Sequence, residues 1–564
     1  MRVRARWFPA IALACGCSRE PAPAVMQDAP APAPAQGPAP GPTPPSAASL
    51  REATRILAAD EMDGRRPGTP GGARAVAKII EWMGALGLQP AGEGGGWTQA
   101  VPMRSVTTDR DRVSLVLVAD GATPRPLRHA SEIVVSTFGP AGTHRVDAEL
   151  VFVGYGVTAP QYDWDDYAGV DVDGRIAVAL VGDPPLADGR FAGDALTYYG
   201  RWSYKFEEGL RHGARGVLLV HETAAASYGW NVVETSWTHG RTHVAEPAGD
   251  ARRAPDVLPI QGWLHRDAAV ALAGRCGTTL EAWHAAAIDP SATRGTSCGR
   301  LRGEFVTVDA RTEDVNVLGK LVGARWPDQA VVVTAHWDHL GHAPDPEPGA
   351  DAIFNGAIDN ASGVAGMLGV ATALQVRAHA GRPLGRTVLF LATTGEEEGL
   401  LGSTWYADHP TIPLADLAAV VNLDSMNVHG RTRNIAVIGP GQTTIEDVLG
   451  EVAAAEGRTV VPDEHPASGG YFRSDHFSFA RRGVPAIYLR GGTDMESGGT
   501  EEGARLGQAN ASHYHTVDDE FDAAWSFEGT LQDVLTVASL VGRIADAETP
   551  PSWRPTSEFA GVRR

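Results

Sequence analysis

Histidines and carboxylates follow several apolar runs of this sequence at the point where each run ends. His336 follows VVVTA, Glu396–Glu398 follow VLFLATTG, and Asp424 follows AVVNL. Asp359 lies in the turn-like segment NGAIDNASGVAG, and His515 lies in SHYHTVDDEFD. Imidazole nitrogens and carboxylate oxygens are zinc ligands in proteins. Each residue alone has an ordinary explanation as a turn, cap or surface residue, but together, at the ends of neighbouring strands, they predict a functional site.

A sheet has to bring these residues together. From about residue 305 to 545, apolar runs alternate with helical stretches such as GVAGMLGVATALQVRA. The runs are QAVVVTA, RTVLFLA, LAAVVNL, NIAVIG and VPAIYL. Continuous apolar strands that alternate with helices predict an α/β fold with a buried, mostly parallel sheet. Ligands of such sheets gather at the carboxyl ends of the strands, where these histidines and carboxylates lie.

The rest of the chain has a different pattern. We expect a helix capped by Ser49 and a second helix over Ala73–Leu86, separated by a Gly/Pro-rich turn. Between about 145 and 300, short β runs such as RIAVALVG and RGVLLVH, with frequent Trp and Tyr, predict a separate inserted domain that is rich in strands and poor in helices. The residues after 548 are expected to form a loose tail.

Five of these segments resemble metallopeptidase family 28, the co-catalytic zinc aminopeptidases and glutamate-carboxypeptidase-like enzymes. They are TAHWDHLG, NGAIDNASGVAG, TGEEEGLLGS, VVNLDSMN and YHTVDDEFD, in the family's order and approximate spacing. The segment VFVGYGVTAPQYDWDDYAGVDVDGRIAVALVGDPP resembles the protease-associated (PA) domain found inside many members. The resemblance covers roughly residues 48–545 and implies an α/β/α sandwich with a mixed, mostly parallel central sheet and an inserted β-rich PA domain.

The leader pattern, the composition and the resemblance together predict six regions. They are a signal peptide (1–17), a Pro/Ala-rich linker (18–47), the N-terminal part of the peptidase domain (48–140), the PA-like insert (141–303), the catalytic domain (304–547) and a C-terminal tail (548–564).

By position, the resemblance also implies two zinc ions and their ligands. One zinc receives His336 and Asp424, and the other receives Glu397 and His515. Asp359 bridges the two ions, and Glu396 is the general base. Glu398 has no expected catalytic role.

The chemistry of this ligand set is consistent with hydrolysis. Two Zn²⁺ bring four positive charges, and the carboxylates of Asp359, Glu397 and Asp424 bring three negative ones. A water that bridges the ions would supply the nucleophile, because zinc lowers the pKa of bound water from 15.7 to about 7. Glu396 would take its proton and pass it to the leaving amine.

Other residues of these segments are expected to support the site. Asp338 lies two residues after His336, so on an extended strand end it can accept the second ring N–H of that histidine. Tyr514 is either an oxyanion donor or a packing residue.

The neighbouring polar residues have less definite expectations. His339 and His342 are expected not to be ligands. The segment RSDHFSF is expected to line the cleft, with no role assigned to Asp475 or His476. The resemblance suggests a cis peptide bond at Asp359–Asn360.

The N-terminus predicts export. Arg2, Arg4 and Arg6 precede a short apolar run that ends in LACGCS, which resembles a lipoprotein signal with Cys15 or Cys17 as the lipidated residue. A periplasmic or outer-membrane-anchored protein is therefore expected, or a secreted one. Cys276 and Cys298 are either a disulfide or two free thiols.

The expected function is that of an exported aminopeptidase that acts on the N-termini of peptides or proteins. The formal net charge of −20 argues against nucleic acid as a partner, and contact with a membrane is expected only through the lipid anchor. Carboxypeptidase or dipeptidase activity remains open, as do a one-metal glutaminyl-cyclase-like relative and a receptor-like relative without catalysis.

Overall fold

The computed structural model describes residues 42–119, 121–226, 228–238, 240–245, 258–289, 295–343, 346 and 348–562. The predicted signal peptide, with Cys15 and Cys17, and most of the predicted linker lie outside these residues and stay predictions.

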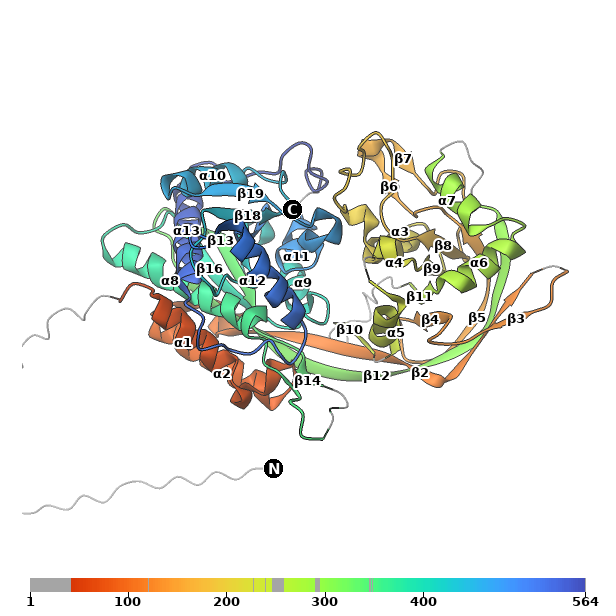
Figure 1. Cartoon of the computed structure of the whole chain (residues 1–564), viewed down its shortest axis with the longest axis horizontal. Coiled ribbons are helices and arrows are strands. Elements are labelled where there is room, and N and C mark those ends of the chain that lie inside the picture. Colours follow the sequence, from red (N-terminus) through yellow and green to blue (C-terminus); the bar gives the residue numbers. More distant parts are fainter. Residues whose placement is uncertain are drawn as a thin grey trace, which may run out of the picture. The chain divides into compact units, whose positions relative to one another are not determined.

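The described chain contains both helices and strands (Figure 1). The helices are α1 (Ala47–Leu57), α2 (Pro70–Ala85), α3 (Trp202–Arg211), α4 (Thr223–Ala226), α5 (Trp230–Thr238), α6 (Arg266–Arg275), α7 (Leu280–Ile288), α8 (Gly363–His379), α9 (Leu401–Asp408), α10 (Ile445–Ala455), α11 (His476–Ala480), α12 (Gly499–His513) and α13 (Glu528–Asp546).

The strands are β1 (Gln89–Pro90), β2 (Thr98–Val118), β3 (Arg125–Leu127), β4 (Ile133–Ser136), β5 (Gly142–Phe152), β6 (Thr158–Ala159), β7 (Trp164–Asp165), β8 (Ile176–Leu180), β9 (Gly216–Val220), β10 (Arg241–Val244), β11 (Ile260–Leu264), β12 (Ser297–Leu321), β13 (Trp326–His336), β14 (Gly341–His342), β15 (Ile353–Phe354), β16 (Arg386–Thr393), β17 (Leu417–Leu423), β18 (Asn434–Ile438), β19 (Thr459–Pro462) and β20 (Ala486–Gly491).

The central sheet has the order β19-β18-β20-β17-β13-β16-β12. Strands β20, β17, β13 and β16 run parallel, whereas β18 is antiparallel to β20 and β12 is antiparallel to β16. The predicted mixed, mostly parallel sheet is confirmed. Strand β13 lies between the parallel strands β17 and β16, so the residue at the carboxyl end of β13 has the end of another strand on each side.

Helices cover both faces of this sheet because the residues of each strand alternate between two cores. Val331 and Val333 of β13 pack with α1, α2, α8, α10 and α13. Ala330 and Val332 pack with α9 and α11 on the opposite face. The result is the predicted α/β/α sandwich.

A second body contains the parallel strands β5, β8, β9 and β11, with β4 antiparallel to β11. Helices α6 and α7 pack on one face, and α3 and α5 on the other. The prediction of few helices is wrong here, because strands such as Ile176–Leu180 are buried on both faces and need a helical layer on each. One of its cores includes Leu115 and Ile133, which precede the expected start at residue 141.

Two long antiparallel strands connect the bodies. Residues 317–321 of β12 pair with β16, and residues 297–307 of the same strand pair with β5 (Figure 1). Strand β2 runs beside β12 over most of that length. The identity of the second body as a PA domain stays a prediction.

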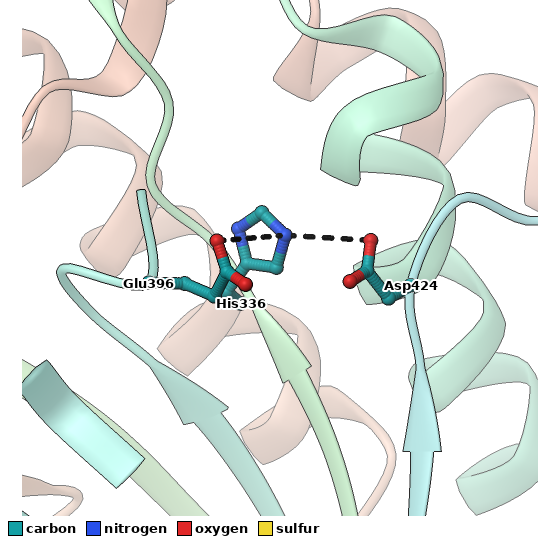
Figure 2. Close-up of side chains that lie close together, drawn as sticks. All are labelled: His336, Glu396 and Asp424. Atoms are coloured by element: carbon teal, nitrogen blue, oxygen red, sulfur yellow. Dashed lines mark ion pairs between the residues drawn. The ribbon is translucent and has the colours of Figure 1, made fainter. Parts of the chain in front are cut away.

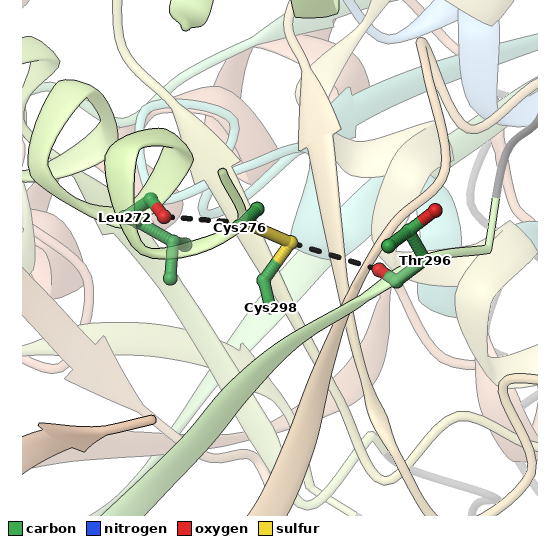
Figure 3. Close-up of a disulfide and its surroundings, with 4 residues drawn as sticks. All are labelled: Leu272, Cys276, Thr296 and Cys298. Carbon is green, nitrogen blue, oxygen red and sulfur yellow. Dashed lines mark hydrogen bonds between the residues drawn. A yellow bond between two sulfur atoms is a disulfide. The ribbon is translucent and has the colours of Figure 1, made fainter. Parts of the chain in front are cut away.

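The cysteines outside the leader form a disulfide. Cys276 follows the last residue of α6, and Cys298 lies in β12, with the two Cα atoms 4.5 Å apart (Figure 3). Of the two states left open by the sequence, the structure contains the bonded one.

Both N-terminal helices begin earlier than predicted. Ser46, not Ser49, caps α1: the Ser46 hydroxyl accepts the N–H of Ser49 at 3.1 Å, and the Ser49 hydroxyl accepts the N–H of Ser46 at 3.0 Å. This is a reciprocal capping box. Thr69 caps α2, with Pro70 as the first helical residue, where its missing N–H costs nothing.

Helix α8 is a core helix despite its apolar composition. The helical segment Ala357–His379 is long and apolar enough to cross a bilayer, but 83% of its apolar window is buried inside the protein. Its residues pack against α13 and β13.

The C-terminal residues are packed, so the prediction of a loose tail is wrong. Phe559 is only 2% exposed and belongs to the core beneath α9 and α11. Trp553 donates its indole N–H to the carbonyl of Gly483 at 3.0 Å. Glu558 accepts the N–H of Tyr198 at 3.2 Å and so connects the tail to the second body.

Glu558 in the tail makes the stability of the folded protein depend on pH. Burial raises the pKa of the Glu558 carboxyl to about 8, against an ordinary value of 4.5, and the Tyr198 N–H opposes the shift. The folded protein therefore holds this proton at pH values where the unfolded chain has released it. The contribution of Glu558 to stability thus falls as the pH rises from 4.5 to about 8.

We predict that Glu558→Gln raises the midpoint of thermal unfolding at pH 8 more than at pH 5, because the amide needs no proton. Calorimetry at both values measures this. Glu548→Gln, at an exposed position at the start of the tail, is the control. An equal shift at both pH values would contradict the assignment.

Candidate metal centre

Three neighbouring strands bring His336, Glu396 and Asp424 together. Thr334 of β13 pairs with Asn422 of β17, which aligns His336 with Asp424 two residues further on. Figure 2 shows the carboxylates of Glu396 and Asp424 on opposite sides of the His336 ring. The Nε2 atom of His336 is 3.6 Å from Asp424 Oδ1 and 4.0 Å from Glu396 Oε2.

Asp359 lies between two histidines. Its Oδ1 is 3.2 Å from His336 Nε2, and its Oδ2 is 3.2 Å from His515 Nε2. The residue sits in an irregular helical turn before α8, and the peptide bond Asp359–Asn360 is cis, as the resemblance suggested. One carboxylate thus presents one oxygen to each imidazole, which is the arrangement that a bridging ligand needs.

Glu397 completes the second half of the site. Its Oε2 is 2.9 Å from His515 Nε2, and its Oε1 is 2.6 Å from His339 Nδ1. The sequence predicted only that His339 is not a ligand and assigned it no other role. The structure shows that this buried ring fixes the orientation of the Glu397 carboxylate.

The third glutamate points elsewhere. Glu398 accepts a hydrogen bond from the Thr242 hydroxyl at 2.8 Å and from Arg66 at 3.3 Å. Thr242 belongs to β10, so Glu398 links the turn after β16 to two distant segments. His342 is also outside the site, with its Nε2 2.5 Å from Asp63.

Asp338 has a different partner from the one expected. The Nδ1 atom of His336 is 3.3 Å from the backbone carbonyl of Asp338 and 3.8 Å from its carboxylate. The carboxylate instead accepts the backbone N–H of Glu396 at 3.2 Å. Asp338 therefore positions the backbone of Glu396, and its carbonyl faces the histidine ring.

The donor set fits zinc. Two groups of side chains are close enough to hold a metal ion, namely His336, Glu396 and Asp424, and His336, Asp359 and Glu397. The buried Nε2 of His515 has no hydrogen-bond partner in the described part of the chain, yet it faces carboxylate oxygens of Asp359 and Glu397. A nitrogen lone pair that faces two carboxylates needs a proton or a cation between them, and zinc takes this combination of ligands.

Comparison with known proteins assigns the part of the chain that carries the candidate ligands to a known family. A family model described as "Peptidase family M28" matches residues 316–539. These residues form an M28 peptidase domain. Every candidate ligand lies inside this segment.

Two curated proteins from fungi match a shorter stretch. Both are described as "Probable zinc metalloprotease", from Pyrenophora teres f. teres (strain 0-1) and Pyrenophora tritici-repentis (strain Pt-1C-BFP), and are 38% and 37% identical to this chain over 108 residues. The match covers 19% of this chain and 22% and 23% of theirs, so it spans less than a quarter of these relatives.

Solved structures match almost the whole length of the chain, at low sequence identity. An aminopeptidase from Aneurinibacillus sp. strain AM-1 is 17% identical with a TM-score of 0.46, and the match covers 92% of this chain and 96% of that one. A zinc aminopeptidase from Bacillus subtilis is 19% identical with a TM-score of 0.40, over 92% and 98% of the two chains. At these values the likeness says nothing about activity.

Two residues outside the predicted set fix the backbone of the M28 site. Arg65 is fully buried and donates to the backbone carbonyls of Leu57, Trp337, Asn355 and Gly356, at 2.6–2.9 Å. Asp519 accepts the N–H groups of Ile358 and Asp359 at 2.9 and 3.0 Å. The segments before and around Asp359 are thus held to the end of β13 and to the segment that carries His515.

The remaining predicted residues divide into exposed and buried ones. Tyr514 is 56% exposed, and its ring stacks on His515 with centroids 3.8 Å apart. Its role as an oxyanion donor stays a prediction. Asp475 and His476, to which the sequence assigned no role, are fully buried. Asp475 accepts a hydrogen bond from Thr393 at the end of β16.

The electrostatics of the metal-free M28 site favour charged imidazoles. Burial lowers the pKa of His336, but Glu396, Asp359 and Asp424 raise it, and the result is well above the ordinary value of 6.5. Burial also lowers the pKa of His515, but Asp359 and Glu397 raise it, and the result is about 10. Burial raises the pKa of Glu396 well above 4.5, and the neighbouring carboxylates reinforce this.

We predict that zinc binding releases at least two protons at pH 7, because both histidines must be neutral to bind a metal. Apparent zinc affinity should therefore rise steeply with pH. Titration calorimetry in buffers of different ionisation enthalpy counts the protons. His342→Gln should release the same number, and zinc binding without proton release would contradict these pKa values.

Proposed function

We propose that this chain is a zinc-dependent exopeptidase, most specifically an aminopeptidase with two zinc ions. The observation that carries the proposal is the Asp359 carboxylate, with one oxygen toward His336 and the other toward His515. Each half of the site then has one imidazole, a shared carboxylate and one terminal carboxylate, which leaves a position open in a tetrahedral shell.

The proposed ligands are His336, Asp359, Glu397, Asp424 and His515. Zinc bound there would supply Lewis acidity for a peptide carbonyl and an acidified water.

Glu396 is the proposed proton carrier. It is buried beside the candidate ligands, and its Oε2 is farther from His336 Nε2 than are the facing oxygens of Asp359 and Asp424. Asp338 holds its backbone, which restricts where the carboxylate can lie. In this role Glu396 takes a proton from the attacking water and returns it to the leaving amine nitrogen. The hydroxyl of Tyr514 is the proposed hydrogen-bond donor to the developing oxyanion.

The preference for an N-terminal amine is supported by charge. The proposed zinc ions would compensate the charges of Asp359, Glu397 and Asp424, so Glu396 is the carboxylate of this cluster that remains to attract a substrate ammonium group. Carboxypeptidase or dipeptidase activity is the alternative within the same family.

We also propose that the protein is exported and that its PA-like insert limits access to the site. The basic and apolar leader supports export, and the contact between Thr242 of the insert and Glu398 supports a location close to the site. Peptides are then the proposed substrates, and a lipid anchor is the proposed membrane contact.

The activity is tested with a panel of aminoacyl p-nitroanilides and their N-acetylated counterparts. We predict that the free amines are hydrolysed, that N-acetylation abolishes turnover, and that a zinc chelator does the same until zinc is restored. Equal hydrolysis of the blocked series would refute the aminopeptidase assignment. Activity that survives chelation would refute the metal mechanism. One tightly bound zinc per chain, measured by elemental analysis, would favour the one-metal relative.

The three glutamates provide a matched series of variants. We predict that Glu396→Gln keeps two zinc ions and loses about 10²–10⁴-fold in kcat, the usual contribution of a general acid–base. Glu397→Gln should lose zinc, because it removes a terminal ligand. Glu398→Gln should keep both zinc and most of kcat. Metal content and kcat are measured on all three, and loss of zinc from Glu398→Gln instead of Glu397→Gln would show that the positions are shifted by one.

A further inference from the structure

His339 is a buried histidine beside the candidate metal centre that has no proposed ligand role. Its side chain is fully buried, and its Nδ1 is 2.6 Å from Glu397 Oε1. Among the described Asp and Glu residues, Glu397 is the one that pairs with this ring. A zinc ion needs more ligands than one imidazole and one carboxylate. The ring is therefore placed to act on Glu397 and not on a metal of its own.

The two carboxylate oxygens of Glu397 have different partners. Oε2 is 2.9 Å from Nε2 of His515, which is a proposed zinc ligand, whereas Oε1 faces His339. The rings of His339 and His515 are close to each other, with centroids 5.8 Å apart and planes at 68°. One carboxylate thus connects an imidazole that belongs to the proposed ligand set with an imidazole that does not.

The backbone leaves the His339 ring little freedom to move. The N–H of His339 donates to the carbonyl of Arg65 at 3.3 Å, and the Arg65 guanidinium binds the carbonyls of Asn355 and Gly356. Gly356 has a φ of +55°, and a Cβ at this position would lie 2.5 Å from Cδ2 of the His339 ring. The close approach of ring and backbone therefore requires glycine, and it fixes where the ring lies.

The direction of the hydrogen bond follows from the chemistry of the pair. An ionised carboxylate only accepts hydrogen bonds, so Nδ1 of His339 is the donor to Oε1 of Glu397. The Nε2 atom of His339 is buried and has no hydrogen-bond partner among the residues that the structure describes. A buried donor without a partner is costly. The tautomer with its hydrogen on Nδ1 is therefore the one that this environment favours.

A donor on Oε1 changes what Glu397 can offer to a metal. A carboxylate binds an ion through one oxygen or through both. Zinc in catalytic sites has three protein ligands and keeps a fourth position for water or substrate. A second oxygen from Glu397 would fill that position. The hydrogen bond from His339 keeps Oε1 occupied, and Oε2 is the oxygen that faces His515.

We infer that His339 is a positioning residue, whose Nδ1–H holds Oε1 of Glu397 so that this carboxylate offers a single oxygen to the ion that it would share with His515. The inference rests on the proposed two-zinc function. Loss of a hydrogen-bond partner of a metal ligand typically changes metal affinity or activity about 10–100-fold. In the described chain no hydrogen bond or ion pair joins His339 to His336 or Asp424, so the effect should concern one of the two ions.

Two substitutions separate the hydrogen bond from the packing of the ring. His339→Asn places an amide nitrogen where Nδ1 lies, so it keeps the donor and loses volume. His339→Leu keeps most of the volume and loses the donor. We expect His339→Leu to weaken the binding of one zinc ion about 10–100-fold and to leave the other unchanged, whereas His339→Asn should bind both as the wild type does. Competition with a chromogenic chelator gives the two dissociation constants.

Cobalt reports on the number of oxygens that bind. Co²⁺ absorbs visible light much more strongly in four-coordinate than in six-coordinate surroundings. At saturating Co²⁺, His339→Leu should absorb less than the wild type because the released Oε1 joins the ion, and His339→Asn should match the wild type. His342→Asn and His342→Leu are the matched controls, at an exposed histidine that pairs with Asp63, and should change neither measurement.

Each outcome decides the inference. Loss of zinc affinity in His339→Asn would assign the effect to packing and overturn it, even if His339→Leu does not fold. Unchanged affinities in His339→Leu, or an equal loss for both ions, would also overturn it, and unchanged cobalt absorption would overturn the role of Oε1. These measurements need no substrate. A wild-type chain that binds two zinc ions without hydrolysing the aminoacyl p-nitroanilides would contradict the proposed function and not the role of His339.

Discussion

The concentration of carboxylates at one end of the central sheet is the constraint on which the M28 domain depends. Asp359, Glu396, Glu397 and Asp424 meet within a few ångströms of two imidazoles. Buried carboxylates without compensation are costly. The chain compensates part of this charge itself, through raised pKa values of His336 and His515, and the proposed zinc ions would compensate the rest. The same arrangement that destabilises the metal-free site therefore favours metal binding.

The surrounding structure holds these charges in place mainly through the backbone. The guanidinium of Arg65 binds carbonyls on both sides of the site, and Asp519 and Asp338 accept backbone N–H groups next to Asp359 and Glu396. Backbone contacts fix where a side chain begins without competing for its oxygens. The functional carboxylates thus keep free lone pairs, and Arg65 adds a positive charge beneath them.

The sequence was most informative where local pattern and function coincide. Apolar runs predicted β13, β16 and β17, and the residues just after them are the ones that the structure brings together, because strand ends share one edge. Contacts between segments that lie far apart in the sequence were not predicted. Arg65 contacts carbonyls 272 to 291 residues away, and no local pattern reports such a contact. The burial of Phe559 likewise depends on a core assembled from distant segments.

Two further wrong predictions, the cap of α1 and the few helices of the second body, concern local sequence patterns that fit more than one structure. Ser46 and Ser49 are three residues apart and both fit a cap, and only their reciprocal hydrogen bonds decide between them. In the second body, runs such as Ile176–Leu180 and Gly216–Val220 are apolar throughout, which indicates strands covered on both faces. That signal was present, and it would have predicted the helices α3, α5, α6 and α7.

The three glutamates of the run Glu396–Glu398 lie in three different environments. Glu397 faces the imidazoles of His339 and His515, which lower its pKa to about 2 against the effect of burial and keep it ionised, in agreement with its proposed role as a ligand. Glu396 has no such partner, and burial raises its pKa, which suits a group that exchanges protons. Glu398 turns outward to Arg66 and Thr242. Because those partners come from the N-terminal segment and from the second body, Glu398, for which no chemical role is proposed, connects both to the turn that carries Glu396 and Glu397.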